Sequence, residues 1–249
     1  MPDSSPKSIT LPGVEDRTLI IGRTGSGKTW FGLWLLSKMP IDQMPWIIVD
    51  FKRESAIARI PYLQEIPIGE IPTRPGVFVV RPFPTQETEM EEYFMQIWDA
   101  EGIGLYIDEG VMVANNAALD AILIQGRSKQ IPVIMLSQRP VGISRFAFSE
   151  SQYFVVFPNH DKRERKTISE FTPIFPTSAS LDEIMLPRYH SYYYEVTGNR
   201  VTKLAPVPDI TTILATFERK LRPSPEPDVV SIGTQKSDAD PMQIKYVPI

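Results

Sequence analysis

The sequence predicts an α/β fold built on a doubly wound, mostly parallel sheet, and three observations lead to this prediction. Short apolar runs alternate with longer segments of helical spacing along most of the chain. These runs are apolar at most successive positions instead of every second one, as expected of parallel strands that are covered by helices on both faces. A glycine-rich stretch also joins the first apolar run to the first helical segment, where such folds place a phosphate-binding loop.

The elements follow one another in a regular order. Apolar runs that end at glycine, proline or charged residues predict strands at 17–21, 45–50, 77–80, 103–107, 132–136 and 153–157. Helical spacing of apolar residues predicts helices at 30–39, 88–100, 117–126 and 162–171. Two further strands, 192–196 and 200–204, flank Thr-Gly-Asn and predict a hairpin.

Composition places the chain among globular proteins and suggests its divisions. With 249 residues, 42% of them hydrophobic and 22% charged, the chain suits one domain with appendages. We expect a loose N-terminal arm at 1–16, a single domain at 17–221 and a flexible, proline-rich tail at 222–249. Residues 53–75 contain four prolines and are expected to be irregular.

Several classes of site are excluded or disfavoured by residue counts. The absence of cysteine excludes disulfides, thiolate metal sites and cysteine nucleophiles. The two histidines, His160 and His190, are too scattered for a zinc site and are expected on the surface or in packing. No apolar run approaches the roughly 18–20 residues that span a bilayer, so we expect no direct membrane insertion. The net charge of −4 gives no overall basic footprint for nucleic acid, so any DNA contact must be local or shared around a ring.

The glycine-rich stretch fits the pattern G-x-x-x-x-G-K-[ST] in full, which identifies a P-loop nucleoside triphosphatase. Its backbone N–H groups and the following helix N-terminus favour a phosphate group, so ATP with Mg²⁺ is the expected ligand. Lys28 is expected to reach the β- and γ-phosphates, and Thr29 to hold Mg²⁺. Arg23 is open between contacts with phosphate or a neighbouring subunit and simple solvation. The residues of the loop are Gly22, Arg23, Thr24, Gly25, Ser26, Gly27, Lys28 and Thr29.

Polar side chains at the ends of two later strands complete the predicted site. Asp108 and Glu109 follow the strand at 103–107, and ligands bind at this edge of a parallel sheet. Asp108 is expected to hold Mg²⁺ through its water shell, and Glu109 to act as general base on the attacking water; the alternative is an acidic pair that caps a helix. Gln138 follows the next strand and is expected to sense the γ-phosphate or orient water, or else to be a turn residue.

Taken together, these segments resemble the FtsK–HerA branch of P-loop motors over roughly residues 17–171. Asp108-Glu109 matches the acidic pair of that branch. The other stretches that carry the likeness are Ile48-Val-Asp-Phe-Lys52, Gly126-Arg-Ser-Lys129 and Leu136-Ser-Gln-Arg-Pro140. The resemblance implies a RecA-like sheet of the type with an additional strand and a catalytic glutamate.

Size narrows the resemblance to the genome-packaging ATPases of icosahedral viruses with an internal membrane. The chain has neither the membrane segments and large extra domains of translocases and coupling proteins nor an added barrel domain. The resemblance then implies a homo-oligomeric ring, often hexameric, that pumps double-stranded DNA into a preformed capsid. Capsid or portal vertex proteins are the implied partners, and the host cytoplasm or the virion is the implied location.

A ring implies an arginine that reaches the γ-phosphate of the neighbouring subunit. The candidates are Arg127, Arg139, Arg163 and Arg165, of which Arg127 and Arg163 are favoured. The alternative for 162–166, Lys-Arg-Glu-Arg-Lys, is a solvated helix face with internal charge pairs. Lys52 and Arg53 are open between phosphate or DNA contacts and ordinary surface charges.

Two other functions remain open on the residues alone. Filamentous-phage assembly ATPases and secretion or conjugation ATPases share the same core with a different cargo. A small-molecule kinase or a nucleotide switch belongs to another class, although Asp108-Glu109 favours water as the nucleophile and no Asn-Lys-x-Asp motif is present. The run Tyr192-Tyr-Tyr194 is expected to pack within the hairpin, with Tyr193 on the opposite face from its neighbours, rather than to stack on bases.

Overall fold

The structure is a computed structural model that describes residues 9–175 and 185–223. Half of the predicted N-terminal arm, residues 1–8, and nearly all of the predicted tail, residues 224–249, therefore lie outside the described residues.

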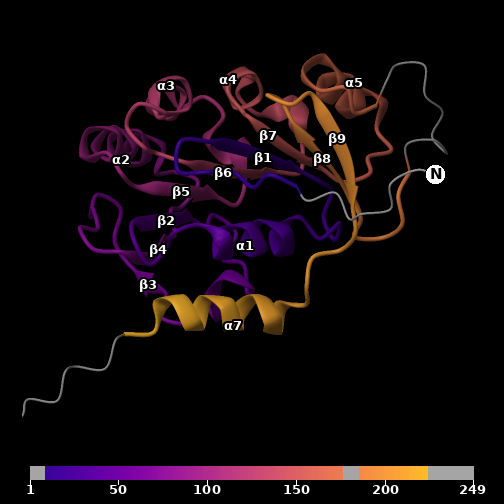
Figure 1. Ribbon diagram of the computed structural model, residues 1–249. Helices are drawn as coiled ribbons and strands as arrows, with labels where there is room; N and C mark the ends of the chain where they lie inside the picture. The colour runs from indigo at the N-terminus through magenta and orange to yellow at the C-terminus, as the bar shows by residue number, and fades with distance from the viewer. Residues whose placement is uncertain (1–8, 176–184, 224–249) are drawn as a thin grey trace, which may run out of the picture.

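One mixed sheet of nine strands organises the described part of the chain (Figure 1). The strands lie in the order β3-β4-β2-β5-β6-β1-β7-β8-β9. All neighbours from β3 to β7 pair in parallel, and β8 and β9 are added antiparallel at one end. The strands are β1 (Arg17–Ile21), β2 (Pro45–Val49), β3 (Gln64–Glu65), β4 (Gly76–Val80), β5 (Gly104–Ile107), β6 (Val133–Ser137), β7 (Tyr153–Val156), β8 (Ser191–Glu195) and β9 (Arg200–Leu204).

Helices cover both faces of this sheet, as Figure 1 shows, with α2 to α5 on one side and α1 and α7 on the other. The α-helices are α1 (Lys28–Lys38), α2 (Glu87–Ala100), α3 (Ala117–Gln125), α4 (Arg145–Ser149), α5 (Lys162–Phe171) and α7 (Ile210–Leu221). Short 3₁₀ turns are η1 (Ile57–Arg59), η2 (Gly110–Val113) and η3 (Pro140–Gly142). The predicted doubly wound, mostly parallel sheet is confirmed.

The core consists of two apolar layers because successive strand residues point to opposite faces. Leu19 and Ile21 of β1 enter the layer beneath α2 to α5, whereas Ile20 between them enters the layer beneath α1 and α7. The same alternation divides the three tyrosines of β8. Tyr193 lies in the α1 layer and Tyr192 and Tyr194 in the other, and all three are buried, as expected of packing residues.

The predicted elements are present with small shifts, and three elements were not predicted. Helix α1 begins at Lys28 instead of residue 30, and β8 spans 191–195 instead of 192–196. Strand β3, inside the segment expected to be irregular, has only two residues, too few for a pattern. Helix α4 has five residues. Helix α7 was missed although Asp209 caps it and its apolar residues at 210, 213, 214, 217 and 221 recur at helical spacing.

Sheet order brings three segments of the predicted site to one end of the parallel strands. Strand β6 lies between β1 and β5, so Gln138 follows the strand that separates the phosphate loop from Asp108 and Glu109. A helix-covered parallel sheet binds ligands at the carboxyl ends of its strands, and all three segments follow such ends. The topology with one strand between the loop and the acidic pair agrees with the additional-strand type that the resemblance implied.

Candidate functional site

The phosphate loop connects the end of β1 to the start of α1. Its first residue is fixed to the sheet, since the N–H of Gly22 donates to the carbonyl of Ser137 at 3.1 Å. Gly27 has φ of 101° and precedes α1 directly, a conformation that suits glycine because it has no Cβ. The loop therefore leads directly into α1, whose first N–H groups have no partner within the helix and can face an anion.

Lys28 points into the protein rather than into solvent. Its residue is only 6% exposed. Burial lowers the pKa of the Lys28 ammonium, and the nearby positive charge of Lys52 lowers it further, while Asp108 and Glu109 act in the opposite direction. A buried ammonium with a lowered pKa is under-neutralised by its surroundings, so an anion that binds in the loop would be strongly attracted to it.

Asp108 is the most unusual carboxylate among the described residues. It is 1% exposed, and neither side-chain oxygen has a hydrogen-bond partner there. Desolvation raises the pKa of Asp108 to about 7, against the opposing effect of Lys52. A buried carboxylate without hydrogen-bond partners costs free energy. This indicates that a bound group, which is not part of the protein chain, would satisfy the oxygens of Asp108.

These observations fit a Mg²⁺ ion. Magnesium is commonly held by one or two carboxylates, retained waters and the substrate phosphates, instead of a full protein cage. In the described ranges, no three His, Cys, Asp or Glu side chains form a metal-binding cluster. Asp108 and the hydroxyl of Thr29 at the start of α1 are the residues that would hold the ion, as the sequence predicted; these roles stay predictions.

A chain of polar contacts crosses the carboxyl ends of four strands. The hydroxyl of Thr24 in the phosphate loop donates to Oε1 of Gln138 at 2.8 Å. The backbone N–H of Gln138 donates to Oε1 of Glu109 at 3.3 Å. The Lys52 ammonium, after β2, contacts Oε2 of Glu109. The contacts run in sheet order, β1, β6, β5 and β2, so each strand end in the row is linked to the next.

The contact between Lys52 and Glu109 bears on the role of Lys52, which the sequence left open between phosphate or DNA contacts and an ordinary surface charge. Lys52 is partly exposed and Glu109 is buried, so their ion pair is shielded from water on the carboxylate side. Lys52 is thus a partner of the predicted general base and more than an ordinary surface charge. Arg53 differs: it stacks over the exposed ring of Phe83, with 4.9 Å between the guanidinium carbon and the ring centroid.

Asp50 holds the start of the loop that carries Lys52. It is fully buried, accepts the N–H of Glu54 at 3.0 Å, and accepts from Nε of Arg81 at 3.3 Å. The carboxylate therefore fixes the turn after β2 and ties it to the turn after β4. The sequence showed Asp50 only as part of a resemblance, and Arg81 and Glu54 carried no signal. Glu54 lies close enough for its negative charge to raise the pKa of both Lys28 and Asp108.

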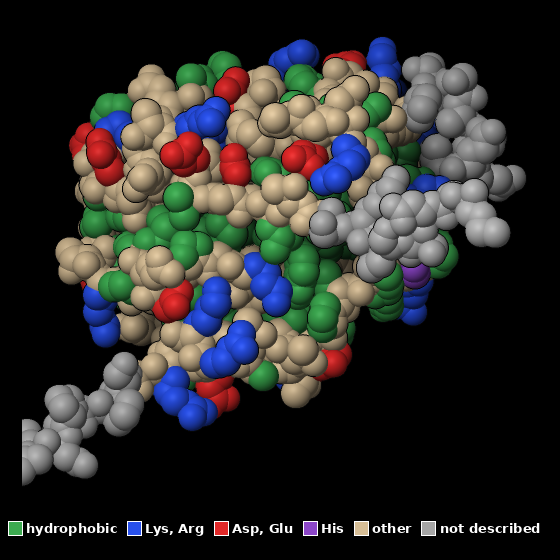
Figure 2. Space-filling model, in the orientation of Figure 1, with side chains coloured by type: hydrophobic (Ala, Val, Ile, Leu, Met, Phe, Trp, Pro, Cys, Tyr) green, Lys and Arg blue, Asp and Glu red, His purple; other side chains and the backbone are tan. Residues whose placement is uncertain are grey.

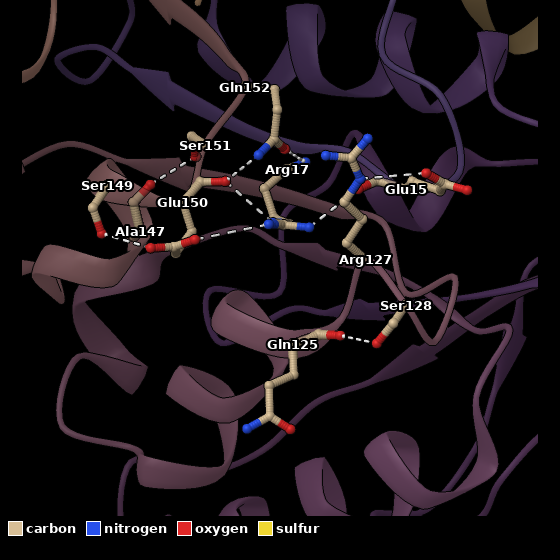
Figure 3. A network of polar contacts seen from close by, with 10 residues as sticks. All are labelled: Glu15, Arg17, Gln125, Arg127, Ser128, Ala147, Ser149, Glu150, Ser151 and Gln152. Carbon is tan, nitrogen blue, oxygen red and sulfur yellow. Dashed lines mark hydrogen bonds and ion pairs between the residues drawn. The ribbon is translucent and has the colours of Figure 1, made fainter.

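The candidate arginines lie at opposite ends of the strands. Arg127 lies at their amino ends, and the other arginines lie at their carboxyl ends. Arg127 is in the turn before β6, near Arg17 at the start of β1, as Figure 3 shows. Its Nε lies 3.4 Å from Oε2 of Glu15, and the two side chains are 68% and 51% exposed. An exposed ion pair of this kind contributes at most about 1 kcal/mol, so Arg127 is free to take another partner.

The other arginines lie near the phosphate loop of the same chain. Arg163 is exposed in the first turn of α5, and its side chain makes no hydrogen bond or ion pair with any described residue. Arg165 donates to the carbonyls of Asn159 and His160 at 3.2 and 2.7 Å, which occupies it. Arg23 and Arg139 both line a shallow pocket beside Gln138. The structure brings neither Arg127 nor Arg163 to this chain's own acidic pair.

Two aromatic residues beside the phosphate loop carried no sequence signal. Phe157 follows β7 and is 2% exposed, and Tyr189 precedes β8 and is 43% exposed. Both rings lie against Gly27, where a Cβ would approach Cδ1 of Tyr189 to 3.2 Å and Cε1 of Phe157 to 3.6 Å. The chain returns to the loop here through strand pairing of β7 and β8, which no local pattern reveals.

Known proteins resemble this chain in sequence and in fold. The chain is 36% identical over 224 residues to the DNA packaging ATPase P9 of Enterobacteria phage PRD1, a match that covers 85% of this chain and 96% of that protein. The genome packaging NTPase B204 of Sulfolobus turreted icosahedral virus 2, solved in complex with AMPPCP, superposes with a TM-score of 0.62 at 19% identity, over 79% of this chain and 100% of that one.

A more distant structure shares the fold alone. The cytoplasmic domain of the Thermomonospora curvata type VII secretion ATPase EccC has a TM-score of 0.54 at 14% identity, over 86% of this chain and 29% of that one. No protein-family model matches the chain. In the described ranges, no helix has the length and apolar character needed to cross a membrane.

Proposed function

Since this chain belongs to the family of viral DNA packaging ATPases, we propose that it hydrolyses ATP to drive double-stranded DNA into a preformed capsid. The observation that supports this best is the row of contacts from Thr24 through Gln138 and Glu109 to Lys52, which joins the phosphate loop to the predicted general base. The family assignment favours packaging over the other cargoes and over a kinase or a switch.

In the proposed reaction, each residue of the site has a separate role. Lys28 and the loop N–H groups bind the β- and γ-phosphates, while Thr29 and Asp108 hold Mg²⁺, which when bound neutralises charge on the phosphate oxygens. Glu109 accepts the proton of the attacking water. Its two oxygens contact Lys52 and the N–H of Gln138, but a carboxylate offers about four acceptor positions, so about two stay available.

Gln138 couples this chemistry to the loop. Its side-chain oxygen is bound to Thr24, so any change in the loop on binding a γ-phosphate would reach Gln138 directly. Its backbone N–H in turn contacts the base. We therefore keep the predicted sensor role for Gln138 as part of the proposal.

We further propose that the working form is a homo-oligomeric ring at the packaging vertex of a capsid, in the infected cell or in the virion. In such a ring, an arginine from one subunit completes the site of the next. Arg127 suits this role because it is exposed, weakly held and far from its own phosphate loop. Arg163 remains the second candidate, since its side chain has no partner among the described residues.

The test is phosphate release from ATP by the purified full chain, with and without long duplex DNA. We expect DNA to stimulate the rate, Lys28→Ala to abolish it, and Glu109→Gln to retain bound ATP without turnover. Arg200→Ala, which removes an exposed pair with Glu195 in the hairpin, is the control and should match the unchanged protein. Equal rates with and without DNA, together with no rings by electron microscopy with AMPPCP and duplex DNA, would make us abandon the translocase.

A further inference from the structure

Tyr189 is placed against the phosphate loop, and its exposure calls for an explanation. One edge of its ring covers Gly27, and Phe157 lies beside it on the same glycine. Phe157 is buried at 2% exposure, but Tyr189 leaves 43% of its surface to solvent. The tyrosine therefore presents an aromatic surface directly beside the N-terminus of α1.

The backbone holds Tyr189 in this position in spite of a cost. Its φ is 64°, in the left-handed region that bulky residues seldom adopt. The N–H of His190 donates to the carbonyl of Pro187 at 3.1 Å, which closes the turn around Tyr189. Strand β8 starts at the next residue but one and pairs with β7, which anchors the turn to the sheet (Figure 1). Unfavourable backbone conformations that are held in this way often mark ligand sites.

Arg188 adds a positive charge to the same surface. Its guanidinium carbon lies 4.6 Å from the centroid of the Tyr189 ring, a cation–π arrangement. It forms no ion pair with any described residue. A guanidinium plane that no ion pair holds can stack on the flat ring of a ligand.

The orientation of the site determines which part of a nucleotide meets this surface. Gln138, Glu109 and Asp108 lie on the β6 and β5 side of the loop, so the reacting γ-phosphate belongs there. The remainder of the nucleotide must then leave the loop on the β7 side, where Phe157 and Tyr189 lie against Gly27.

Resting on the proposed function, we infer that Tyr189 and Arg188 form the platform on which the base of the nucleotide stacks. Every base offers a π face, so the platform accepts nucleoside triphosphates in general and favours purines through their larger ring. The platform would strengthen nucleotide binding without contributing to phosphate binding.

The experiment compares two probes on the full chain with Mg²⁺: AMPPCP, which has a base, and inorganic tripolyphosphate, which has none. Calorimetry should show that Tyr189→Leu weakens AMPPCP about tenfold, as expected for the loss of one stacked base, and leaves tripolyphosphate unchanged. Leucine can still cover Gly27 but has no π face, so this variant separates stacking from packing. Tyr189→Phe should bind both probes as the unchanged protein does, and Arg188→Ala should weaken AMPPCP alone by a few-fold.

The matched control is Tyr62→Ala. Tyr62 is 46% exposed and has φ of 59°, so it shares the exposure and the backbone conformation of Tyr189, but it lies in a pocket with Arg222 and Pro223. Its replacement should change neither probe. Unchanged AMPPCP binding in Tyr189→Leu, or equal loss of both probes, would overturn the platform. If the unchanged protein bound neither probe, the nucleotide site and the proposed function would fail together.

Discussion

Asp108 shows how a single buried carboxylate can weaken the fold that carries it. Its pKa is raised to about 7, chiefly by desolvation, from an ordinary value near 3.8. Between these two values the folded state holds a proton that the unfolded state has released, so the stability contributed by this group is lost as pH rises from about 4 to about 7. Both oxygens lack partners among the described residues, which is the structural origin of the effect.

We expect Asp108→Asn to stabilise the nucleotide-free protein, and to do so more at high pH. The amide carries no charge to desolvate, so the difference in the free energy of unfolding should widen by about 3 kcal/mol between pH 5 and pH 8. Urea unfolding of both proteins at the two pH values measures it. Parallel stabilities at pH 5 and pH 8 would contradict the buried, unpartnered state of Asp108.

Gln138 is expected to act on turnover more than on affinity. Gln138→Ala removes the side chain that binds Thr24 but keeps the backbone contact with Glu109. We expect kcat for ATP to fall on the order of 10²-fold, as for a lost transition-state contact, with little change in KM. Gln125→Ala, an exposed glutamine at the end of α3, is the matched control. A raised KM at unchanged kcat would assign Gln138 to binding.

At the scale of elements, α7 is held by the apolar side chains of one face and by a hydrogen bond near its end. Phe217 is fully buried in the layer beneath α1, one turn from Ile213, and Lys220 donates to the carbonyl of Met39 at 2.7 Å. Because α1 begins with Lys28, α7 supports the helix that follows the phosphate loop.

Phe217→Ala should therefore lower the free energy of unfolding by about 3–5 kcal/mol, the usual cost of emptying a buried phenylalanine site. Chemical denaturation is the measurement. Thr211→Ala, at an exposed position of the same helix, should change it by less than about 0.5 kcal/mol. A loss below 1 kcal/mol in Phe217→Ala would mean that α7 does not pack as described.

The strands were predictable from sequence because most are buried on both faces and read as continuous apolar runs. All five residues of β1, β4 and β6 are buried, for example. Helix α7 was not predicted even though its apolar residues recur at helical spacing, so the sequence carried a signal that went unused. Within the site, the loop and Asp108-Glu109 were predictable because they follow strand ends and carry motifs. Contacts of Lys52 and Tyr189 depend on sheet order and chain return, which local patterns do not contain.

At the scale of the whole molecule, charge is distributed rather than concentrated. The net charge is −4, and Figure 2 shows Lys and Arg side chains intermingled with Asp and Glu over the upper part of one face. A proposed DNA contact must then rest on a few local cations. DNA-stimulated ATPase activity should fall steeply between 50 and 200 mM salt, because cation–phosphate contacts release counterions, while the basal rate changes little. A stimulation that ignored salt would count against DNA as the cargo.

The proposed ring makes a further prediction that no single subunit can satisfy. Arg127→Ala and Lys28→Ala should each be inactive, but a mixture in equal amounts should recover about a quarter of the full rate, since random neighbours restore one site in four when the arginine acts across a closed ring. Arg163→Ala mixed with Lys28→Ala tests the second candidate in the same assay. Absence of recovery in both mixtures would exclude both arginines as trans-acting groups.

The place of β6 between β1 and β5 also fixes the distance between these two strands. Neighbouring strands lie about 4.8 Å apart, so the loop strand and the acidic strand are held roughly 10 Å from each other by backbone hydrogen bonds alone. The separation between the end of the loop strand and the acidic pair is thus set by the peptide backbone. Conservative changes such as Ile134→Val inside β6 can weaken the fold, yet they leave the separation of β1 and β5 unaltered.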